Sequence, residues 1–394
     1  MAYTAFSKRL AWWKLVPLLL VFCTLGLWMP VQAGRQSAVE QKQIESLSPA
    51  EFTRLIQDLS EEGGFFRSDN FTSNETSYLH VVGRLREMHL SGGAYIGVGP
   101  EQNFTYIAKL HPKIAFIVDI RRQAMIQHLL YKAIFQISDT RVDFLSNLIS
   151  RPLDQKDAPA KDVPIEKVLD YLATAPAPPS VLTANLSRVR RMIEEQFGFT
   201  LSVADQDQLE YVYTTFQREG LEISFRSGQR SPWGGYWGWP TLKDLVLQPD
   251  LEGNPGNFLI SEEDYSYIRG MQRKNLIIPV VGDFAGPKAL ASVGDYLRKN
   301  GFVVRVFYTS NVEQFLFQNG VFAEFVRNVQ KLPIDSTSVF IRAVPERGQP
   351  HPAHVLGHRT TTLLEKISVF LKDYESGTYS GYHELTATHF IAGP

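Results

Sequence analysis

The sequence predicts an α/β fold with a mostly parallel sheet that is interrupted by a mainly helical insertion. Two parts of the chain, residues 77–150 and 275–345, alternate short apolar runs with helical segments, which is the pattern of parallel strands joined by crossover helices. Residues 151–274, between these two parts, show helical segments without that alternation. The chain has 394 residues, 44% of them hydrophobic, so it can bury a sizeable core.

The first 33 residues have the layout of a secretory signal peptide. Three basic residues precede an apolar run over residues 15–29, and Val31 and Ala33 stand at the −3 and −1 positions of a cut before Gly34. An uncleaved membrane anchor is the alternative interpretation. Either segment would engage the membrane or the secretion machinery. Either would also leave the rest of the chain exported, in the periplasm or on the outer face of the cytoplasmic membrane.

Residues 34–76 are expected to form a linker followed by one helix and a loop. Ser48 and Pro49 are typical of a helix start, and an apolar stripe follows them up to Leu59. The stretch from Glu61 to Thr76 is rich in Gly, Ser, Asn and Asp, which favours a loop. A further helix is expected from about Ser77 to Met88.

The fold is organised around residues 92–121. An apolar strand from Ala94 to Val98 contains Gly97 and is followed by Gly99, a helix, and a second apolar run that ends in Asp119. In a βαβ unit of this kind, glycines let the backbone approach a ligand, and the acid can accept hydrogen bonds from ribose hydroxyls. The alternative is a tight turn that needs glycine for its geometry alone.

The insertion is expected to be built from helices and one unusual loop. A long helix is predicted after Asp119, before the insertion, and within the insertion helices are predicted over 165–172, over 181–219 with a break near Ser202, and from 261 to about 275. Residues 224–240 form a loop dense in aromatic and basic side chains, namely Arg226, Arg230, Trp233, Tyr236, Trp237 and Trp239. This loop could be a lid, a stacking platform for a ring-shaped ligand, a membrane-interface contact, or an Ω-loop packed on the insertion.

The second half of the sheet is predicted from three apolar runs, 276–281, 302–308 and 338–344. Asp283 and Asn311 follow the first two of them, so both could line the same crevice as Asp119, because ligands bind at the carboxyl ends of parallel strands. Ser310 to Glu313 is expected to be a capping box that opens the next helix. Residues 346–394 are expected to be a C-terminal extension.

The glycine turn and the acid at residues 97–121 resemble the class I S-adenosylmethionine-dependent methyltransferases, which have a Rossmann-like fold, and more closely an uncharacterised bacterial family. The resemblance covers about residues 77–150 and 275–345. It implies S-adenosylmethionine as the cofactor and methyl transfer as a possible activity, with no catalytic residue assigned. In that resemblance, Asp119 holds the ribose and Asp283 is the acidic position after the fourth strand. The implied cofactor-binding residues are Gly97, Gly99, Pro100, Glu101, Asp119, Arg121, Asp283 and Asn311.

Several function classes are disfavoured. Cys23 is the only cysteine and lies in the signal segment, so a cleaved protein would have no disulfide and no thiolate chemistry. A net charge of −1 gives no reason to expect nucleic acid as a partner. Serine-hydrolase, zinc-protease and Walker motifs are absent from the sequence.

Three histidines, His351, His354 and His358, could be considered as metal ligands. Pro352 and Gly357 disfavour the helix that would align them, so no metal is expected and a solvated linker is the preferred interpretation.

Two functions remain open. The first is binding of a small molecule, and because Glu101 would repel a phosphate, a nucleoside or an amine is favoured over a pyrophosphate. The second is a non-catalytic module that kept the fold and binds a partner or a cell-envelope component through the aromatic loop and the insertion.

Overall fold

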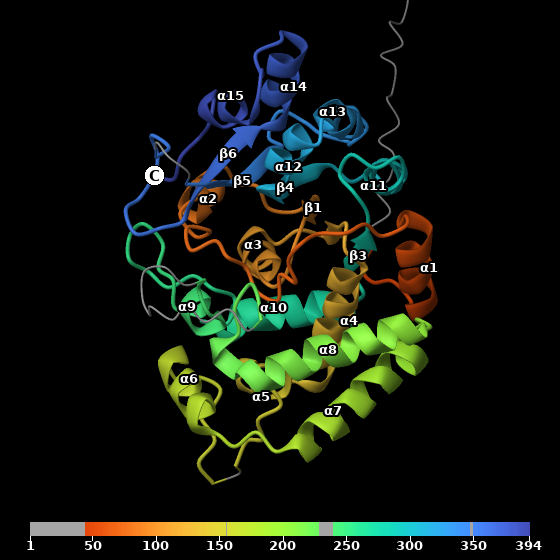
Figure 1. The fold of residues 1–394 in the computed structure, drawn as a ribbon, viewed down its shortest axis with the longest axis vertical. Coiled ribbons are helices and arrows are strands. Elements are labelled where there is room, and N and C mark those ends of the chain that lie inside the picture. Colours follow the sequence, from red (N-terminus) through yellow and green to blue (C-terminus); the bar gives the residue numbers. More distant parts are fainter. Residues whose placement is uncertain (1–43, 155, 228–238, 347–349) are drawn as a thin grey trace, which may run out of the picture. The chain divides into compact units, whose positions relative to one another are not determined.

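Six strands form one sheet in the order β3-β2-β1-β4-β5-β6 (Figure 1). The computed structural model describes residues 44–154, 156–227, 239–346 and 350–394, so the expected signal segment lies outside it. Neighbouring strands from β3 to β5 run parallel, and β6 is antiparallel to β5, which confirms the predicted mostly parallel sheet. The strands are β1 (Ala94–Gly97), β2 (Ile114–Asp119), β3 (Ile277–Val281), β4 (Val304–Ser310), β5 (Val339–Pro345) and β6 (Thr360–Lys366).

The central strands are buried on both faces, which is why they read as continuous apolar runs rather than as alternating patterns. Their register aligns the carboxyl ends of the strands at one edge of the sheet. Gly97 of β1 pairs with Ile117 of β2, and Asp119 at the end of β2 pairs with Val281 of β3. The turns after β1, β2 and β3 therefore meet at this edge.

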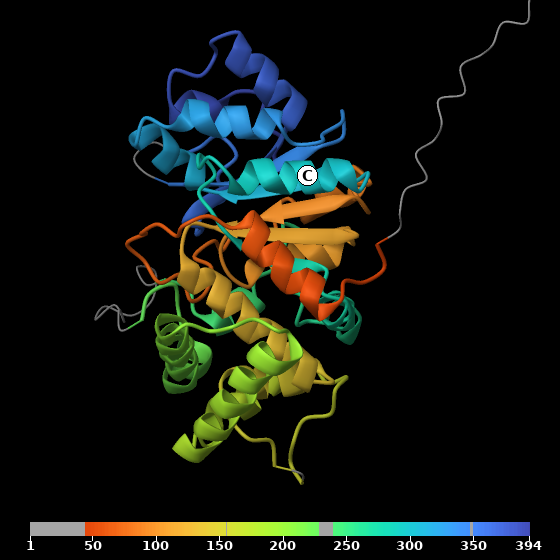
Figure 2. The same ribbon diagram turned by 90° about the vertical axis from the view of Figure 1, so that its right-hand side faces the viewer.

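Helices cover both faces of the sheet (Figure 2). One face carries α3 (Gln102–Leu110), α4 (Arg122–Ile137) and α10 (Glu262–Arg273), and α10 contacts both of the others. The other face carries α11 (Ala289–Lys299) and α13 (Phe322–Gln330). This two-sided cover is what parallel strands require, because neither face of their sheet can meet water.

The insertion is mainly helical, as expected, and its helices continue the layer formed by α4. Residues 41–394 form one unit, and the insertion shares its apolar core with the sheet. The long helix α8 packs on α4, and its start is a capping box made by Ser202 and Asp205. The helices of this region are α5 (Arg141–Leu148), α6 (Ile165–Thr174), α7 (Pro179–Arg191), the π-helical turn η1 (Met192–Gln196), α8 (Val203–Glu219), the short 3₁₀ turn η2 (Gly220–Glu222) and α9 (Leu242–Val246).

Helix α1 (Pro49–Leu59) confirms the predicted start, since Ser48 and Glu51 form a reciprocal capping box. After α1, residues 60–76, which we call the edge segment, run along the carboxyl edge of the sheet. The amide of Glu61 donates to the carbonyl of Val281 at 3.0 Å, and the amide of Gly64 donates to the carbonyl of Ile120 at 2.8 Å. The edge segment thus crosses the ends of β3 and β2. The next predicted helix is realised only as α2 (Val82–Glu87).

Two expectations for the C-terminal part need correction. The capping box at Ser310 is wrong, because the cap of α12 (Val312–Gln318) is Asn311 and makes no side-chain bond, while Glu313 turns inward to Arg342. Residues 346–394 are more than an extension, since they supply β6. They also supply α14 (Ile367–Glu375) and α15 (Tyr382–Ala387).

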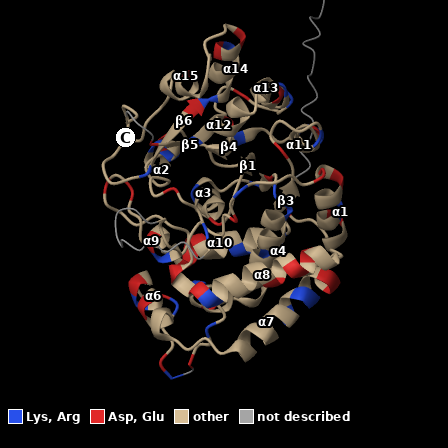
Figure 3. Ribbon diagram, in the orientation of Figure 1, with Lys and Arg blue, Asp and Glu red and all other residues tan. Residues whose placement is uncertain are grey.

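Charged residues lie mostly on the helices and loops, and the central strands are almost free of them (Figure 3). Asp119, at the end of β2, is the only charged residue in β1, β2 and β3. Among the described residues, no helix is long and apolar enough to cross a membrane.

Candidate functional site

A cavity of about 260 Å³ opens at the carboxyl ends of β1, β2, β3 and β4. The edge segment forms one wall, and the turns that follow the four strands form much of the rest. The cavity spans the point between β1 and β4, where the chain order of the strands changes direction. Open α/β sheets bind their ligands at this point.

The cavity collects six of the eight predicted site residues. They come from the turns after all four strands: Gly99, Pro100, Asp119, Arg121, Asp283 and Asn311. Gly97 and Glu101 do not line it. The strand before Asp283 is β3, the third strand along the chain, whereas the resemblance implied the fourth.

Gly97 is required by packing beneath the turn. A Cβ atom at this position would overlap the Asn103 side-chain oxygen and would lie 2.7 Å from Cε1 of Tyr95. The amide of Asn103 donates to the carbonyls of Val98, at 2.9 Å, and Pro100, at 2.8 Å, so it holds the turn closed. Gly97 therefore contributes to the site through the shape of the turn.

Gly99 has a different role, because its φ of +79° is in the left-handed region that favours glycine. A Cβ atom there would meet nothing within 4 Å. The carbonyl of Gly99 accepts a hydrogen bond from Nε2 of His128 at 2.8 Å. Burial lowers the pKa of His128 to about 4, so the ring is neutral and its Nδ1 carries no proton. This turn allows a ligand to approach the backbone closely.

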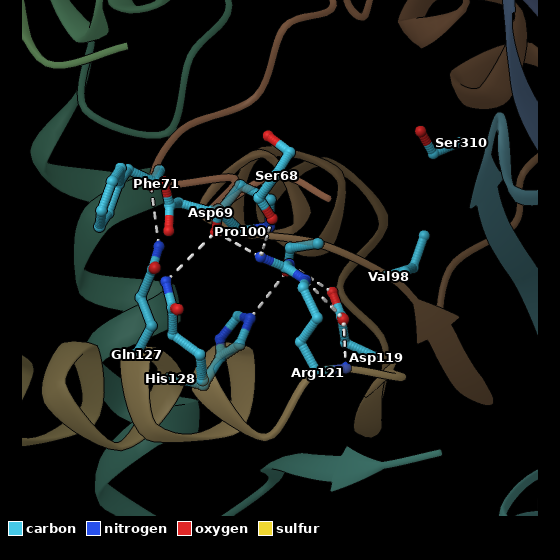
Figure 4. A network of polar contacts seen from close by, with 12 residues as sticks. Ser68, Asp69, Phe71, Val98, Pro100, Asp119, Arg121, Gln127, His128 and Ser310 are labelled. Carbon is cyan, nitrogen blue, oxygen red and sulfur yellow. Dashed lines mark hydrogen bonds and ion pairs between the residues drawn. The ribbon is translucent and has the colours of Figure 1, made fainter. Parts of the chain in front are cut away.

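Asp119 forms a buried ion pair with Arg121 (Figure 4). The guanidinium donates to the two carboxylate oxygens at 3.0 Å and 2.7 Å, and the Arg121 amide adds a third bond at 2.9 Å. The same guanidinium donates to the carbonyls of Ser68 and Asp69. Arg121 therefore ties the edge segment to β2. Of the roughly four acceptor positions of a carboxylate, about one is left on Asp119 for a ligand hydroxyl.

Glu101 points away from the cavity. One carboxyl oxygen accepts a hydrogen bond from the Ser73 amide at 3.2 Å, and the other is buried with no partner in the described part of the chain. It faces a separate small apolar void lined by Phe258 and Tyr131. Burial raises the pKa of Glu101 to about 7. Binding of a cofactor by this residue would need a different arrangement of the turn.

The turn after β3 binds a carboxylate of the protein itself. The backbone amides of Asp283 and Lys288 donate to the Glu61 carboxylate at 2.7 Å and 3.0 Å. Gly286 leaves room for this carboxylate, since a Cβ atom there would overlap it. Among the described residues, the Asp283 carboxylate accepts a hydrogen bond only from the Ala285 amide, at 2.9 Å, so it can still bind a ligand.

The sequence patterns gave no reason to select Glu75, which lies on the cavity wall. It is 2% exposed and accepts hydrogen bonds from the Ser310 hydroxyl and from the Gln102 amide, the latter at 2.9 Å. Burial raises its pKa. Ser310, the last residue of β4, has a φ of +54°, a left-handed conformation that a serine seldom adopts. Sequence patterns could not identify Glu75 as a site residue because it lies in a polar loop without hydrophobic periodicity.

The edge segment also presents two unsatisfied polar atoms. Oδ1 of Asn70 and Oγ1 of Thr72 are buried and have no hydrogen-bond partner among the described residues, and both residues line the cavity. Buried polar atoms without partners are uncommon in folded proteins and indicate a site for water or a ligand.

Aromatic rings form the remaining walls. Phe66 and Phe315 meet edge to face at 5.2 Å between ring centroids. Of the predicted aromatic loop, Phe225, Arg226 and Trp239 line the cavity. The other four side chains named for that loop, Arg230, Trp233, Tyr236 and Trp237, lie outside the described residues.

The three C-terminal histidines have separate partners. His354 contacts Glu346 at 3.1 Å, whereas His358 bonds the Thr76 hydroxyl at 2.9 Å and His351 faces the Thr386 carbonyl at 3.2 Å. Within the part of the chain that the structure describes, no group of three or more possible ligands could hold a metal ion.

The comparison with known proteins identifies a family. No curated protein matches the chain. Residues 70–387, which include the end of the edge segment, the sheet and the insertion, match the family described as "Domain of unknown function (DUF7790)". Because the match covers most of its length, the chain belongs to the DUF7790 family.

Proposed function

We propose that this protein binds a nucleoside-like small molecule in the cavity at the carboxyl edge of the sheet. The observation that carries the proposal is the position of the cavity across the ends of β1 and β4, where the strand order changes direction. The strand order is that of Rossmann-like nucleotide-binding proteins, apart from the antiparallel last strand, which supports a Rossmann-like assignment.

The lining suits a molecule with one flat apolar part and one polyhydroxyl part. Aromatic side chains such as Phe315 and Trp239 offer faces for a base. Asp283 and Asn311 offer free polar atoms for sugar hydroxyls, and the orphaned oxygens of Asn70 and Thr72 gain partners from a ligand that donates hydrogen bonds.

S-adenosylmethionine is the ligand that the methyltransferase resemblance suggests, and these residues fit its adenosine part. When bound, it supplies an electrophilic methyl group, and methyl transfer to an acceptor is the activity proposed with it. Gly99, Asp119, Asp283 and Asn311 are the residues proposed to hold the nucleoside, with Asp119 offering its one remaining acceptor position.

Calorimetric titration of the purified protein with adenosine, S-adenosylhomocysteine and S-adenosylmethionine tests the proposal. We expect micromolar to millimolar binding of all three, weakened by Asp283→Asn. The matched control is Asp295→Asn, which changes an exposed aspartate on α11 whose ion-pair partner is Arg298. Absence of binding at millimolar nucleoside would reject the proposal, and the non-catalytic envelope module would then be the better hypothesis. A methyl-release assay with the labelled cofactor tests catalysis separately.

We also propose that residues 1–33 direct export, as their charge, apolar run and small residues suggest. Fractionation of bacterial cells that express the full chain, with N-terminal sequencing of the product, tests this. Mature protein beginning at Gly34 in the periplasm is expected for cleavage, and full-length protein in the membrane fraction for an anchor. Full-length protein in the cytoplasm would reject export.

A further inference from the structure

We propose that the cavity selects an organic cation, an amine or a sulfonium, whose positive centre lies against the Glu75 carboxylate. This inference rests on the proposed function in one respect, that the cavity binds a small molecule. It adds the charge class of that molecule and the residue that recognises it.

Glu75 is a buried carboxylate without a cationic partner. Among the described residues, no Lys, Arg or His nitrogen lies within ion-pair distance of it, and its hydrogen-bond partners, Ser310, Gln102 and Tyr308, are neutral. Its side chain forms part of the cavity wall, so a bound molecule can reach it. A buried charge is costly unless it is paired, and a ligand cation would supply the missing partner.

Several other buried carboxylates around the sheet each pair with an arginine, and Glu75 has no such partner among the described residues. Asp119 has Arg121, Asp205 has Arg122, and Glu313 has Arg342, each at an N to O distance below 3 Å. Glu101 is the other buried carboxylate described here without a cation, but it faces away from the cavity. Glu75 is therefore an unpaired buried carboxylate that a ligand in this cavity can contact.

The charges around the cavity are separated along its length. Arg121 and Arg226 both reach Ser68, at 3.4 Å to its carbonyl and 3.3 Å to its hydroxyl, so the arginines gather at that end. Arg67 also belongs to this part of the edge segment and is exposed. Glu75 lies at the other end, beside Ser310 of β4. A positive centre is therefore attracted to the β4 end of the cavity.

The aromatic residues of the cavity favour a soft organic cation over a hydrated metal ion. Phe66, Phe315 and Tyr308 line the cavity, and aromatic faces attract ammonium and sulfonium groups by cation–π interaction. A metal ion would need several oxygen ligands at once, and Glu75 is the only carboxylate that the described lining residues offer at the β4 end.

The left-handed backbone conformation of Ser310 helps to position the Glu75 carboxylate. Its φ of +54° ends β4 abruptly and directs the hydroxyl to the Glu75 carboxylate. This conformation is unfavourable for serine and persists because the surrounding contacts hold it. This hydrogen bond orients the carboxylate, and with Gln102 and Tyr308 also bonded to it, about one acceptor position is left for the ligand.

The test uses choline and its uncharged isostere 3,3-dimethylbutan-1-ol, titrated into the full-length protein. We expect the wild type to bind choline about tenfold more tightly than the isostere, and Glu75→Gln to abolish the difference. Glu101→Gln, the same change at a buried carboxyl outside the cavity, should keep it. Phe315→Leu should weaken choline severalfold without changing isostere binding, and this variant keeps the test valid if Glu75→Gln fails to fold.

The outcomes separate this inference from the proposed function, which uncharged adenosine tests. Equal binding of choline and the isostere by the wild type, binding of neither, or a choline preference that survives in Glu75→Gln would each overturn the cation site. If adenosine nevertheless binds, the nucleoside proposal stands alone. A preference for choline that depends on Glu75, together with no adenosine binding, would keep the cation site and reject the nucleoside.

Discussion

The Arg121 guanidinium pairs with the Asp119 carboxylate through two side-chain hydrogen bonds of 3.0 Å and 2.7 Å, and both residues are buried, at 6% and 5% exposure. The acid expected to hold a ribose is thus also a structural partner of the next turn. Replacing Asp119 therefore removes a structural contact as well as a candidate ligand-binding group.

Asp119→Asn should destabilise the protein by about 3–5 kcal/mol, because it leaves the buried Arg121 charge without its partner. Urea denaturation at neutral pH measures this loss. The double variant Asp119→Asn with Arg121→Met should recover part of it, since both charges are then gone. A single variant as stable as the wild type would show that the ion pair contributes little.

Gly97→Ala and Gly99→Ala should both destabilise the protein, but for different physical reasons and by different amounts. Alanine at 97 collides with Asn103 and Tyr95 and should cost more than about 2 kcal/mol through overpacking. Alanine at 99 fits the space but must adopt φ near +79°, which costs about 1–2 kcal/mol. Parallel thermal and urea unfolding of the two variants gives the order, and a Gly99→Ala variant less stable than Gly97→Ala would contradict this account.

Glu101 should make the protein less stable as pH rises from about 4.5 to 7. The unfolded chain releases this proton near pH 4.5, whereas burial keeps it on the folded protein up to about pH 7. The loss across this window is on the order of 3 kcal/mol. Glu101→Gln should remove it, so the variant should gain stability relative to wild type as pH rises. If the free energy of unfolding of wild type and of Glu101→Gln changes equally with pH, Glu101 is not the cause of the pH dependence.

Lys132 should have the opposite pH dependence in a higher window. It is 1% exposed, donates to the Gln272 carbonyl, lies over the rings of Phe52 and Phe197, and burial lowers its pKa to about 7. Between about pH 7 and 10.5 the unfolded chain holds a proton that the folded protein has lost, so stability rises with pH.

Lys132→Met removes this dependence. The variant should be more stable than wild type near pH 6, and its advantage should shrink by about 3 kcal/mol by pH 9. The lost bond to Gln272 opposes the gain by roughly 1–3 kcal/mol at every pH. Denaturant titrations at several pH values measure the difference, and an advantage independent of pH would mean that Lys132 keeps its charge when buried.

Much of the fold could be predicted because the local patterns and the tertiary structure agree. Apolar runs bounded by turns marked five of the six strands, and Ser48 and Ser261 marked helix starts that the structure confirms. The strand β6 was missed because its Thr-rich start has the composition of a polar segment. Only its antiparallel pairing with β5 makes it a buried strand. The capping box at Ser310 failed because a tertiary partner, Glu75, takes the hydroxyl.

The site was predictable only where strands end. Asp119, Asp283 and Asn311 follow strands, so their meeting at one edge follows from the parallel topology. Glu75 and Asn70 reach the same cavity through a loop whose path depends on long-range contacts, such as the bond from Arg121 to the Asp69 carbonyl. No local pattern carries that information.

Photolabelling of the protein with 8-azidoadenosine, with and without excess adenosine, followed by peptide mapping, locates the proposed nucleoside site. We expect displaceable label on peptides of the cavity wall, from residues 65–75, 98–100, 282–284 or 308–316. Label that adenosine does not displace, or displaceable label on a distant surface such as the groove between Arg188 and Gln196, would contradict it.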